Sequence, residues 1–133
     1  MFRTLLIEDN PTFRELVKLN LQSQFPSIEI IEAKDGTEAL GKIDSFPPNL
    51  IFMDIRLPGQ NGLELTKKIK AEHSDITIVI LTSYNLPEYR EAATRYKADY
   101  FLLKDSIATG ELDTLVKSVL SEKGFNPDGS GDG

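Results

Sequence analysis

The stretch Leu50-Ile51-Phe52-Met53-Asp54 is a run of four apolar residues that ends in a carboxylate, and the turn signal Pro58-Gly59 follows it. An apolar run this short, without alternation, is typical of a strand that is covered on both faces of a sheet. Asp54 is then expected at the carboxyl end of that strand, where open α/β sheets place their sites. Taken alone, the segment favours a plain loop start, because Asp is a common turn residue. The chemistry at the ends of the other strands reverses this interpretation.

Five apolar runs alternate with helical patterns along the chain. The runs predict strands at residues 3–7, 28–33, 50–53, 76–81 and 100–103. Each is followed by a helical pattern, and the expected helices begin near residues 11, 36, 62, 87 and 112. In the first helix, the i, i+3, i+4, i+8 pattern predicts one buried face of Phe13, Leu16, Val17 and Leu21. The alternation predicts parallel strands joined by right-handed crossovers, with helices on both faces of the sheet.

The composition narrows the function classes. The chain has 133 residues, enough for one domain, and no cysteine, which excludes disulfides and thiolate metal sites. Its net charge of −6 argues against direct contact with nucleic acid, which needs a basic face. No apolar run approaches the ~20 residues of a membrane span and no signal peptide is visible, so we expect a cytoplasmic protein. We expect a domain over residues 1–121 and a flexible, glycine-rich tail or linker over residues 122–133.

The predicted strand ends carry matching chemistry. Strand ends supply Glu8 and Asp9, Asp54, Thr82 and Lys104, and in a parallel sheet these ends share one edge. Clustered carboxylates repel one another and raise one another's pKa unless a cation intervenes. Mg²⁺ takes one or two carboxylates together with waters and a phosphate, and Lys104 supplies a positive charge suited to a phosphoryl oxygen. A carboxylate nucleophile, a cation, an ammonium group and a hydroxyl together predict a phosphoryl-transfer site.

Four motifs in this order resemble a response-regulator receiver domain (CheY-like) of two-component signal transduction. They are Leu6-Ile7-Glu8-Asp9-Asn10, Met53-Asp54-Ile55-Arg56-Leu57-Pro58-Gly59-Gln60-Asn61-Gly62, Leu81-Thr82-Ser83 and Tyr100-Phe101-Leu102-Leu103-Lys104. Each motif is weak alone, and the ordered set is specific. The resemblance implies an α/β fold of the (βα)₅ flavodoxin-like type, a doubly wound five-stranded parallel sheet of strand order 2-1-3-4-5.

The resemblance also implies roles for individual residues. Asp54 would accept a phosphoryl group from the phosphohistidine of a sensor histidine kinase. Asp9 and Asp54 would ligate Mg²⁺ directly with the backbone carbonyl of Arg56, and Glu8 would act through a water. Thr82 and Lys104 would bind the phosphoryl oxygens. Such a domain takes part in its own phosphorylation and dephosphorylation and is not a turnover enzyme on an external substrate.

A second group of residues is implied to transmit and time the signal. Phe101 lies at the aromatic switch position, where its ring turns inward as Thr82 moves toward the phosphate. Arg56 and Tyr84, two residues after Asp54 and Thr82, would tune the phosphoryl lifetime. The surface of the fourth helix, fifth strand and fifth helix would be the output and a site of homodimerisation. The fifth-strand motif resembles receivers that precede a helix-turn-helix DNA-binding domain, so we expect transcription to be regulated through an effector domain C-terminal to these residues.

The sequence departs from the family pattern at two positions. The lysine is usually followed by a proline with a cis bond, and here Asp105 follows. A cis bond without proline costs roughly 2.5–4 kcal/mol, so we expect a trans bond after Lys104. Glu8 stands where Asp is commoner, which a contact through water should tolerate.

Two other functions fit parts of the pattern. A Mg²⁺-dependent phosphatase with an aspartyl nucleophile commonly has a second acid two residues after that nucleophile, where this chain has Arg56. A flavodoxin-like FMN binder needs a phosphate loop rich in glycine and hydroxyl groups after the first strand, where this chain has Glu8 and Asp9. Turnover of a generic phosphate ester would support the phosphatase, and a yellow purified protein would support the FMN binder.

Overall fold

Five parallel strands form the central sheet of the computed structural model, which describes residues 1–131. The strands are β1 (Arg3–Ile7), β2 (Glu29–Ala33), β3 (Leu50–Met53), β6 (Thr77–Thr82) and β7 (Tyr100–Leu103). Their spatial order is β2-β1-β3-β6-β7. When these five strands are numbered by themselves, this is the predicted order 2-1-3-4-5, and the predicted fold class is confirmed.

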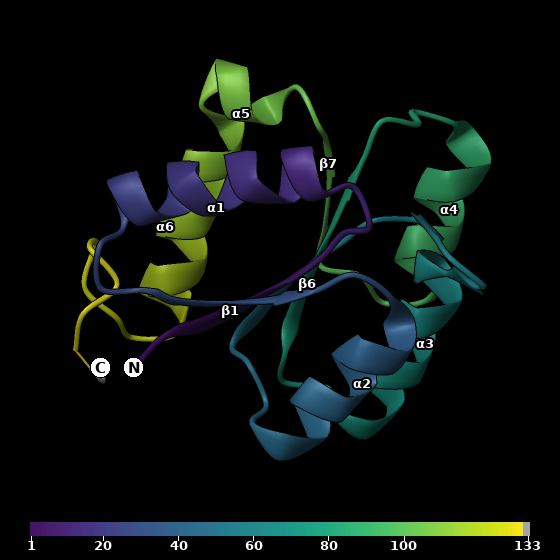
Figure 1. Cartoon of the computed structure of the whole chain (residues 1–133), viewed down its shortest axis with the longest axis horizontal. Helices are drawn as coiled ribbons and strands as arrows, with labels where there is room; N and C mark the ends of the chain where they lie inside the picture. Colours follow the sequence, from purple (N-terminus) through teal and green to yellow (C-terminus); the bar gives the residue numbers. More distant parts are fainter. Residues whose placement is uncertain (132–133) are drawn as a thin grey trace.

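Helices cover both faces of the sheet (Figure 1). On one side lie α1 (Pro11–Gln24) and α6 (Glu111–Glu122), and on the other lie α2 (Gly36–Ser45), α3 (Gly62–Glu72) and α4 (Pro87–Arg95). The two faces have separate apolar cores, because successive strand residues point to opposite sides. In β3, Leu50 and Phe52 join the core under α1 and α6, whereas Ile51 and Met53 join the other core.

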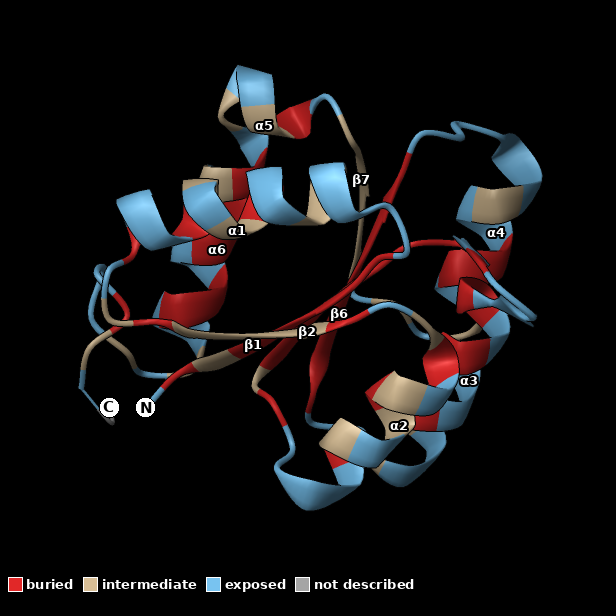
Figure 2. Cartoon of the chain, viewed as in Figure 1, coloured by how far each residue is buried: buried red, intermediate tan, exposed pale blue. Residues whose placement is uncertain are grey.

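The central strands are buried along their whole length, as the apolar runs predict. Every residue of β3 and β6 is buried, whereas the edge strand β2 is mostly half-buried, which its alternating sequence predicts (Figure 2). Local capping fixes where the helices begin. Asn10, Asp35 and Asn61 each accept a backbone hydrogen bond at the first turn of α1, α2 and α3.

The predicted buried face of α1 is wrong at Leu16. Val17 and Leu21 are buried and Phe13 is half-buried, but the side chain of Leu16 is 52% exposed. Each helical residue turns by about 100°, so Leu16 lies about a quarter turn from Val17. The buried stripe follows the i, i+4, i+8 positions and is too narrow to include Leu16.

Two short elements were not predicted. Strands β4 (Arg56–Leu57) and β5 (Gln60–Asn61) pair as an antiparallel hairpin around Pro58-Gly59, where Gly59 has a φ of 69°. Helix α5 (Ser106–Thr109) follows β7. All peptide bonds within residues 1–131 are trans, including the one after Lys104, as predicted.

The segment after α6 folds back toward the amino edge of the sheet, where the strands begin. The ring of Phe125 packs edge-on against buried Phe2 with 5.1 Å between ring centroids. The backbone N–H of Ser27 donates to the carbonyl of Asp128, and Gly129 lies against Ile28. Residues 132 and 133 of the predicted tail lie outside the described residues. Within the part that is described, no helix combines the length and apolar character needed to cross a membrane.

Candidate functional site

The carboxyl edge of the sheet brings together the acids and the lysine predicted from the strand ends. Glu8 and Asp9 follow β1, Asp54 follows β3 and Lys104 follows β7. Carboxylate oxygens of the three acids lie within 4.8 Å of one another. The Lys104 Nζ lies 2.6 Å from the Glu8 Oε1 and 3.6 Å from the Asp54 Oδ2. One cation therefore lies between two buried carboxylates.

Backbone contacts hold Asp54 in place. Its N–H donates to the carbonyl of Ile7, and its Oδ1 accepts a hydrogen bond of 2.9 Å from the N–H of Ile55. Gly62 packs directly against this segment, because a Cβ at that position would lie 1.9 Å from the Asp54 carbonyl oxygen. The Gly62 N–H also donates to the carbonyl of Ile55. The start of α3 thus packs against the backbone that carries the Asp54 carboxylate.

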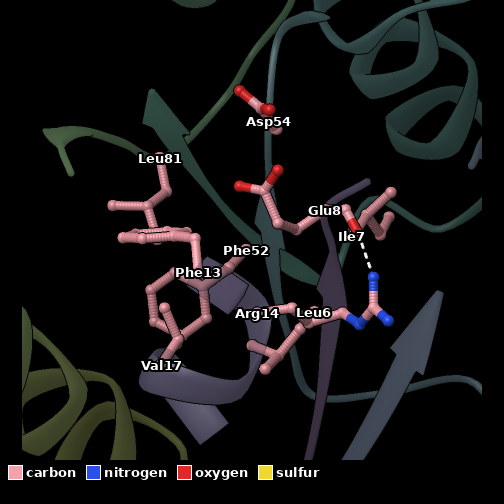
Figure 3. A pocket seen from close by; sticks show the side chains of 9 residues that line it. All are labelled: Leu6, Ile7, Glu8, Phe13, Arg14, Val17, Phe52, Asp54 and Leu81. Carbon is pink, nitrogen blue, oxygen red and sulfur yellow. Dashed lines mark hydrogen bonds between the residues drawn. The ribbon is translucent and has the colours of Figure 1, made fainter. Parts of the chain in front are cut away.

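Glu8 is a buried acid whose surroundings favour its neutral form. Its Oε2 accepts a hydrogen bond from the N–H of Asn10, and Arg14 donates to its backbone carbonyl over 2.7 Å (Figure 3). Burial raises the pKa of Glu8 from 4.5 to about 7, although the Lys104 ammonium opposes this shift. Burial outweighs the ion pair, because Glu8 is only 6% exposed.

The carboxylates of Glu8 and Asp54 lie at the polar end of a pocket. The other walls are mainly apolar and are formed by Leu6, Ile7, Phe13, Val17, Phe52 and Leu81 (Figure 3). The Lys104 Nζ lies 4.5 Å from the centre of the Phe13 ring, a cation–π distance. Phe13, Arg14 and Gly62 therefore take part in building the site, although the sequence indicated only a core residue, a helix residue and a helix start.

The donor set fits a hard divalent cation. Three carboxylates from two segments converge, and carboxylate oxygen is the ligand type that Mg²⁺ prefers. Among residues 1–131, Lys104 is the one cationic side chain that pairs with these acids, at Glu8 and Asp54, and it offsets part of their mutual repulsion. The residues present can hold a metal ion at Glu8, Asp9 and Asp54.

The predicted switch and tuning residues lie in two adjoining groups. Thr82 is fully buried at the end of β6, and its Oγ1 accepts a hydrogen bond from the N–H of Tyr84. Phe101 is half-buried, and the Arg90 guanidinium carbon lies 4.4 Å from its ring centre. The Arg56 guanidinium carbon lies 3.7 Å from the ring centre of Tyr84.

Helix α4 joins the Arg56–Tyr84 pair. The Arg56 Nη2 donates a hydrogen bond of 3.4 Å to the Tyr89 hydroxyl. The Tyr89 ring packs edge-on against the Tyr84 ring, with 6.4 Å between centroids. These contacts connect the loop after Asp54, the loop after Thr82 and the first turn of α4. The aromatic character of residues 84 and 89 is visible in the sequence, but their spacing alone did not indicate this contact.

Residues 4–117 match the family profile described as response regulator receiver domain. The chain belongs to this family. Membership favours a signalling domain over the phosphatase and flavodoxin-like alternatives, and receiver domains are not typical turnover enzymes. The four motifs and their predicted resemblance are thereby confirmed at the level of the family.

Curated relatives of this receiver domain include a transcriptional regulatory protein and a nitrate/nitrite response regulator. It is 31% identical over 128 residues to the transcriptional regulatory protein YdfI of Bacillus subtilis, covering 96% of this chain and 60% of that protein. It is 37% identical over 119 residues to the nitrate/nitrite response regulator protein NarL of Escherichia coli, covering 89% of this chain and 55% of that protein. This chain thus spans little more than half the length of these relatives.

Solved structures share the fold of this receiver domain. The response regulator protein TrrA of Thermotoga maritima, solved in complex with Mg²⁺-BeF, is 38% identical with a TM-score of 0.80, covering 90% of this chain and all of that one. A DNA-binding response regulator of the LuxR family from Staphylococcus aureus is 29% identical with a TM-score of 0.74, covering 90% of this chain and 98% of that one.

Proposed function

We propose that Asp54 accepts a phosphoryl group from the phosphohistidine of a sensor histidine kinase in a Mg²⁺-dependent reaction. The convergence of three carboxylates within 4.8 Å, with Lys104 3.6 Å from Asp54, is the observation that supports this most. In the transfer, an Asp54 oxygen bonds to phosphorus while the bond from phosphorus to the donor imidazole breaks. The electron pair of that bond stays on the imidazole nitrogen.

The side chains around Asp54 have complementary roles in this proposal. Lys104 and Thr82 bind the phosphoryl oxygens; the Thr82 Oγ1 already accepts from the Tyr84 N–H, so its own O–H is free to donate. Asp9, Asp54 and the backbone carbonyl of Arg56 would hold Mg²⁺ directly, and Glu8 would hold it through a water. When bound, Mg²⁺ neutralises charge that develops on the transferred group.

Labelling with a small phosphodonor tests the acceptor. The chain is incubated with Mg²⁺ and acetyl phosphate, and the adduct is measured by intact mass before and after hydroxylamine, which cleaves acyl phosphates. We expect one labile phosphoryl group on the parent chain and on the matched variant Asp44→Asn, whose side chain is exposed on α2. Asp54→Asn should carry none. Equal labelling of Asp54→Asn would remove Asp54 as the acceptor.

Phosphorylation is proposed to switch the surface formed by α4, β7 and α6. Thr82 ends β6 beside β7, and the half-buried Phe101 lies on β7 under the guanidinium of Arg90. A shift of Thr82 toward the phosphoryl group gives the Phe101 ring room to turn inward, which moves a pre-existing equilibrium. Beryllofluoride, a phosphoryl mimic, should change amide NMR shifts along α4, β7 and α6. Changes confined to residues that touch Asp54 would contradict this coupling.

Arg56 and Tyr84 are proposed to tune the phosphoryl lifetime. Their stacked side chains bridge the loops that follow Asp54 and Thr82, so they restrict the approach of water to the aspartyl phosphate. Tyr84→Ala should shorten the lifetime of the adduct in a pulse-chase measurement. Tyr84→Phe keeps the ring and should retain the lifetime of the parent chain. Equal lifetimes for the two variants would exclude the ring as the barrier to water.

The output is proposed to be transcription, through a DNA-binding effector domain that follows a receiver over residues 1–121 in a cytoplasmic protein. The transcription regulators among its relatives, of which this chain spans little more than half, support this. With a net charge of −6, the receiver itself is not proposed to bind DNA. Homodimerisation through α4, β7 and α6 is expected on beryllofluoride addition and is measured by light scattering. A monomer in both states would contradict it.

A further inference from the structure

A basic cleft lies between the C-terminal ends of α3 and α4. It has an open volume of about 510 Å³ and is lined by Lys67, Lys70, Ala71, Arg95, Tyr96 and Lys97. Four of these six residues are cationic, although the chain as a whole carries a net charge of −6. Helices in such a fold run opposite to the strands, so the C-terminal ends of α3 and α4 lie toward the amino edge of the sheet. The cleft is therefore far from Asp54 at the carboxyl edge.

Among the residues that the structure describes, only one of the four cations has an acidic partner. Lys70 pairs with Asp99 at 2.7 Å and also donates to the carbonyl of Ile76, so it belongs to the fold. Within residues 1–131, Lys67, Arg95 and Lys97 form no ion pair with a carboxylate.

An aromatic ring orders two of these cations. The Lys67 Nζ and the Arg95 guanidinium carbon lie 5.3 Å and 5.2 Å from the centre of the Tyr96 ring. The Tyr96 hydroxyl in turn donates to Glu64 of α3. Cations held on a ring lose less side-chain entropy when they bind an anion than freely moving ones.

Lys97 adds an independent observation. It has a φ of 71° and is the one non-glycine residue with positive φ in the described chain. The hydrogen bonds from Lys97 N–H to the Thr94 carbonyl and from Ala98 N–H to the Ala93 carbonyl end α4 in a Schellman motif. Glycine usually occupies this position, because it has no Cβ penalty there. A cation near a helix C-terminus complements the dipole, but Arg95 already supplies one.

We propose that this α3–α4 cleft is the docking site for an acidic segment of a partner polypeptide, whose carboxylates pair with Lys67, Arg95 and Lys97. The charge of the cleft is complementary to such a segment, and its three free cations match a short run of acids. Nucleic acid fits less well, because a duplex needs a basic face that follows its backbone, and the remainder of this chain is acidic.

Fluorescence anisotropy of a fluorescein-labelled poly-Glu peptide, titrated with the whole chain at low salt, tests the cleft. Lys97→Gly should weaken binding about threefold, the size expected for one exposed ion pair. Its melting temperature should stay the same or rise, because glycine relieves the left-handed backbone. The double reversal Lys67→Glu/Arg95→Glu should weaken binding by more than about tenfold. Lys117→Gln also removes one exposed positive charge, on α6, and should leave binding unchanged.

Several results would overturn the proposal. One is equal binding of neutral poly-Gln and poly-Glu, and another is full binding by both cleft variants. A loss of affinity in Lys117→Gln as large as in Lys97→Gly would show that diffuse charge, and not the cleft, attracts the peptide. Displacement of the peptide by duplex DNA at lower concentrations than by unlabelled poly-Glu would make nucleic acid the occupant.

Discussion

The two edges of the sheet bury opposite kinds of side chain. At the carboxyl edge, Glu8 and Asp54 are 6% and 7% exposed, with Lys104 between them. At the amino edge, Phe2 and Phe25 are fully buried, and the ring of Phe125 packs on Phe2. The same strands therefore begin in an apolar plug and end in a cluster of charges.

This contrast separates stability from function. Burying an aromatic ring removes apolar surface from water and favours folding. Burying a carboxylate opposes folding unless it is paired or protonated. The amino edge is therefore expected to stabilise the folded chain, and the carboxyl edge to destabilise it. Removing an aromatic ring at the amino edge should therefore lower the free energy of unfolding. Removing a buried charge at the carboxyl edge can raise it, and substitutions there should also change phosphorylation.

The largest effect on stability is expected at Phe2. Phe2→Ala leaves a cavity in the amino-edge plug and should lower the free energy of unfolding by about 3–5 kcal/mol, measured by urea denaturation. The folded fraction should still accept a phosphoryl group from acetyl phosphate. Leu19→Ala, at a 55% exposed residue of α1, should change stability by less than about 0.5 kcal/mol. A loss of labelling in folded Phe2→Ala would show that the two edges are not independent.

Glu8 should make the carboxyl edge sensitive to pH. Its pKa is raised from 4.5 to about 7 in the folded chain, so between these values the folded state binds more protons than the unfolded state. The Glu8 contribution to the free energy of unfolding should therefore fall as pH rises from about 4.5 to about 7, by up to about 3 kcal/mol. Glu8→Gln cannot ionise and should escape this loss.

The measurement for Glu8 is the difference in the free energy of unfolding between Glu8→Gln and the parent chain, without Mg²⁺, across this pH range. The difference should grow in favour of Glu8→Gln as pH rises. Glu15→Gln, at an exposed acid of α1, serves as the control. A constant difference for Glu8→Gln would mean that the Lys104 ion pair fully offsets the burial.

Gly62 tests how closely the backbone supports Asp54. Gly62→Ala would place a Cβ 1.9 Å from the Asp54 carbonyl oxygen, so the segment must shift. We expect a loss of stability of about 1–3 kcal/mol, the range for overpacking, together with slower phosphorylation by acetyl phosphate. Gly41→Ala in α2 meets no atom within 4 Å and should stabilise the chain by about 0.5–1 kcal/mol. Unchanged phosphorylation in Gly62→Ala would show that the position of Asp54 tolerates this shift.

Phe125→Ala should have the smallest effect of these substitutions on stability. It tests whether the segment after α6 stays packed on the amino edge. Its ring is half-buried, so Phe125→Ala should lower the free energy of unfolding by about 1–2 kcal/mol. The phosphoryl lifetime should not change. If stability is unaffected, residues 125–130 do not stay docked on the sheet, as the prediction of a flexible tail implies.

Much of the site was predictable because it depends on strand ends alone. In a parallel sheet the carboxyl ends of the strands meet, so Glu8, Asp9, Asp54 and Lys104 needed only correct strands to be placed together. Thr82 was expected just beyond its strand and is its last residue, a shift of one position that leaves it at the same edge.

The remaining contacts depend on tertiary distances that periodicity does not encode. The approach of Lys104 to the Phe13 ring joins residues far apart in the chain. Which of the neighbours Leu16 and Val17 is buried depends on how α1 packs on the sheet. Helix α5 has four residues, too few for a helical period to be visible. The hairpin around Pro58-Gly59 had a turn signal, but its two-residue strands are too short to alternate.

The contact between Phe2 and Phe125 brings the start of the chain beside the segment that follows α6 (Figure 1). Both lie at the amino edge of the sheet, and Asp54 follows the carboxyl end of β3 at the opposite edge. A short peptide can therefore join the start of the chain to the segment after Phe125, and new ends can be opened in a surface loop, to give a circularly permuted protein. Reporter proteins fused on this side of the sheet would likewise leave the acidic pocket open to a phosphodonor.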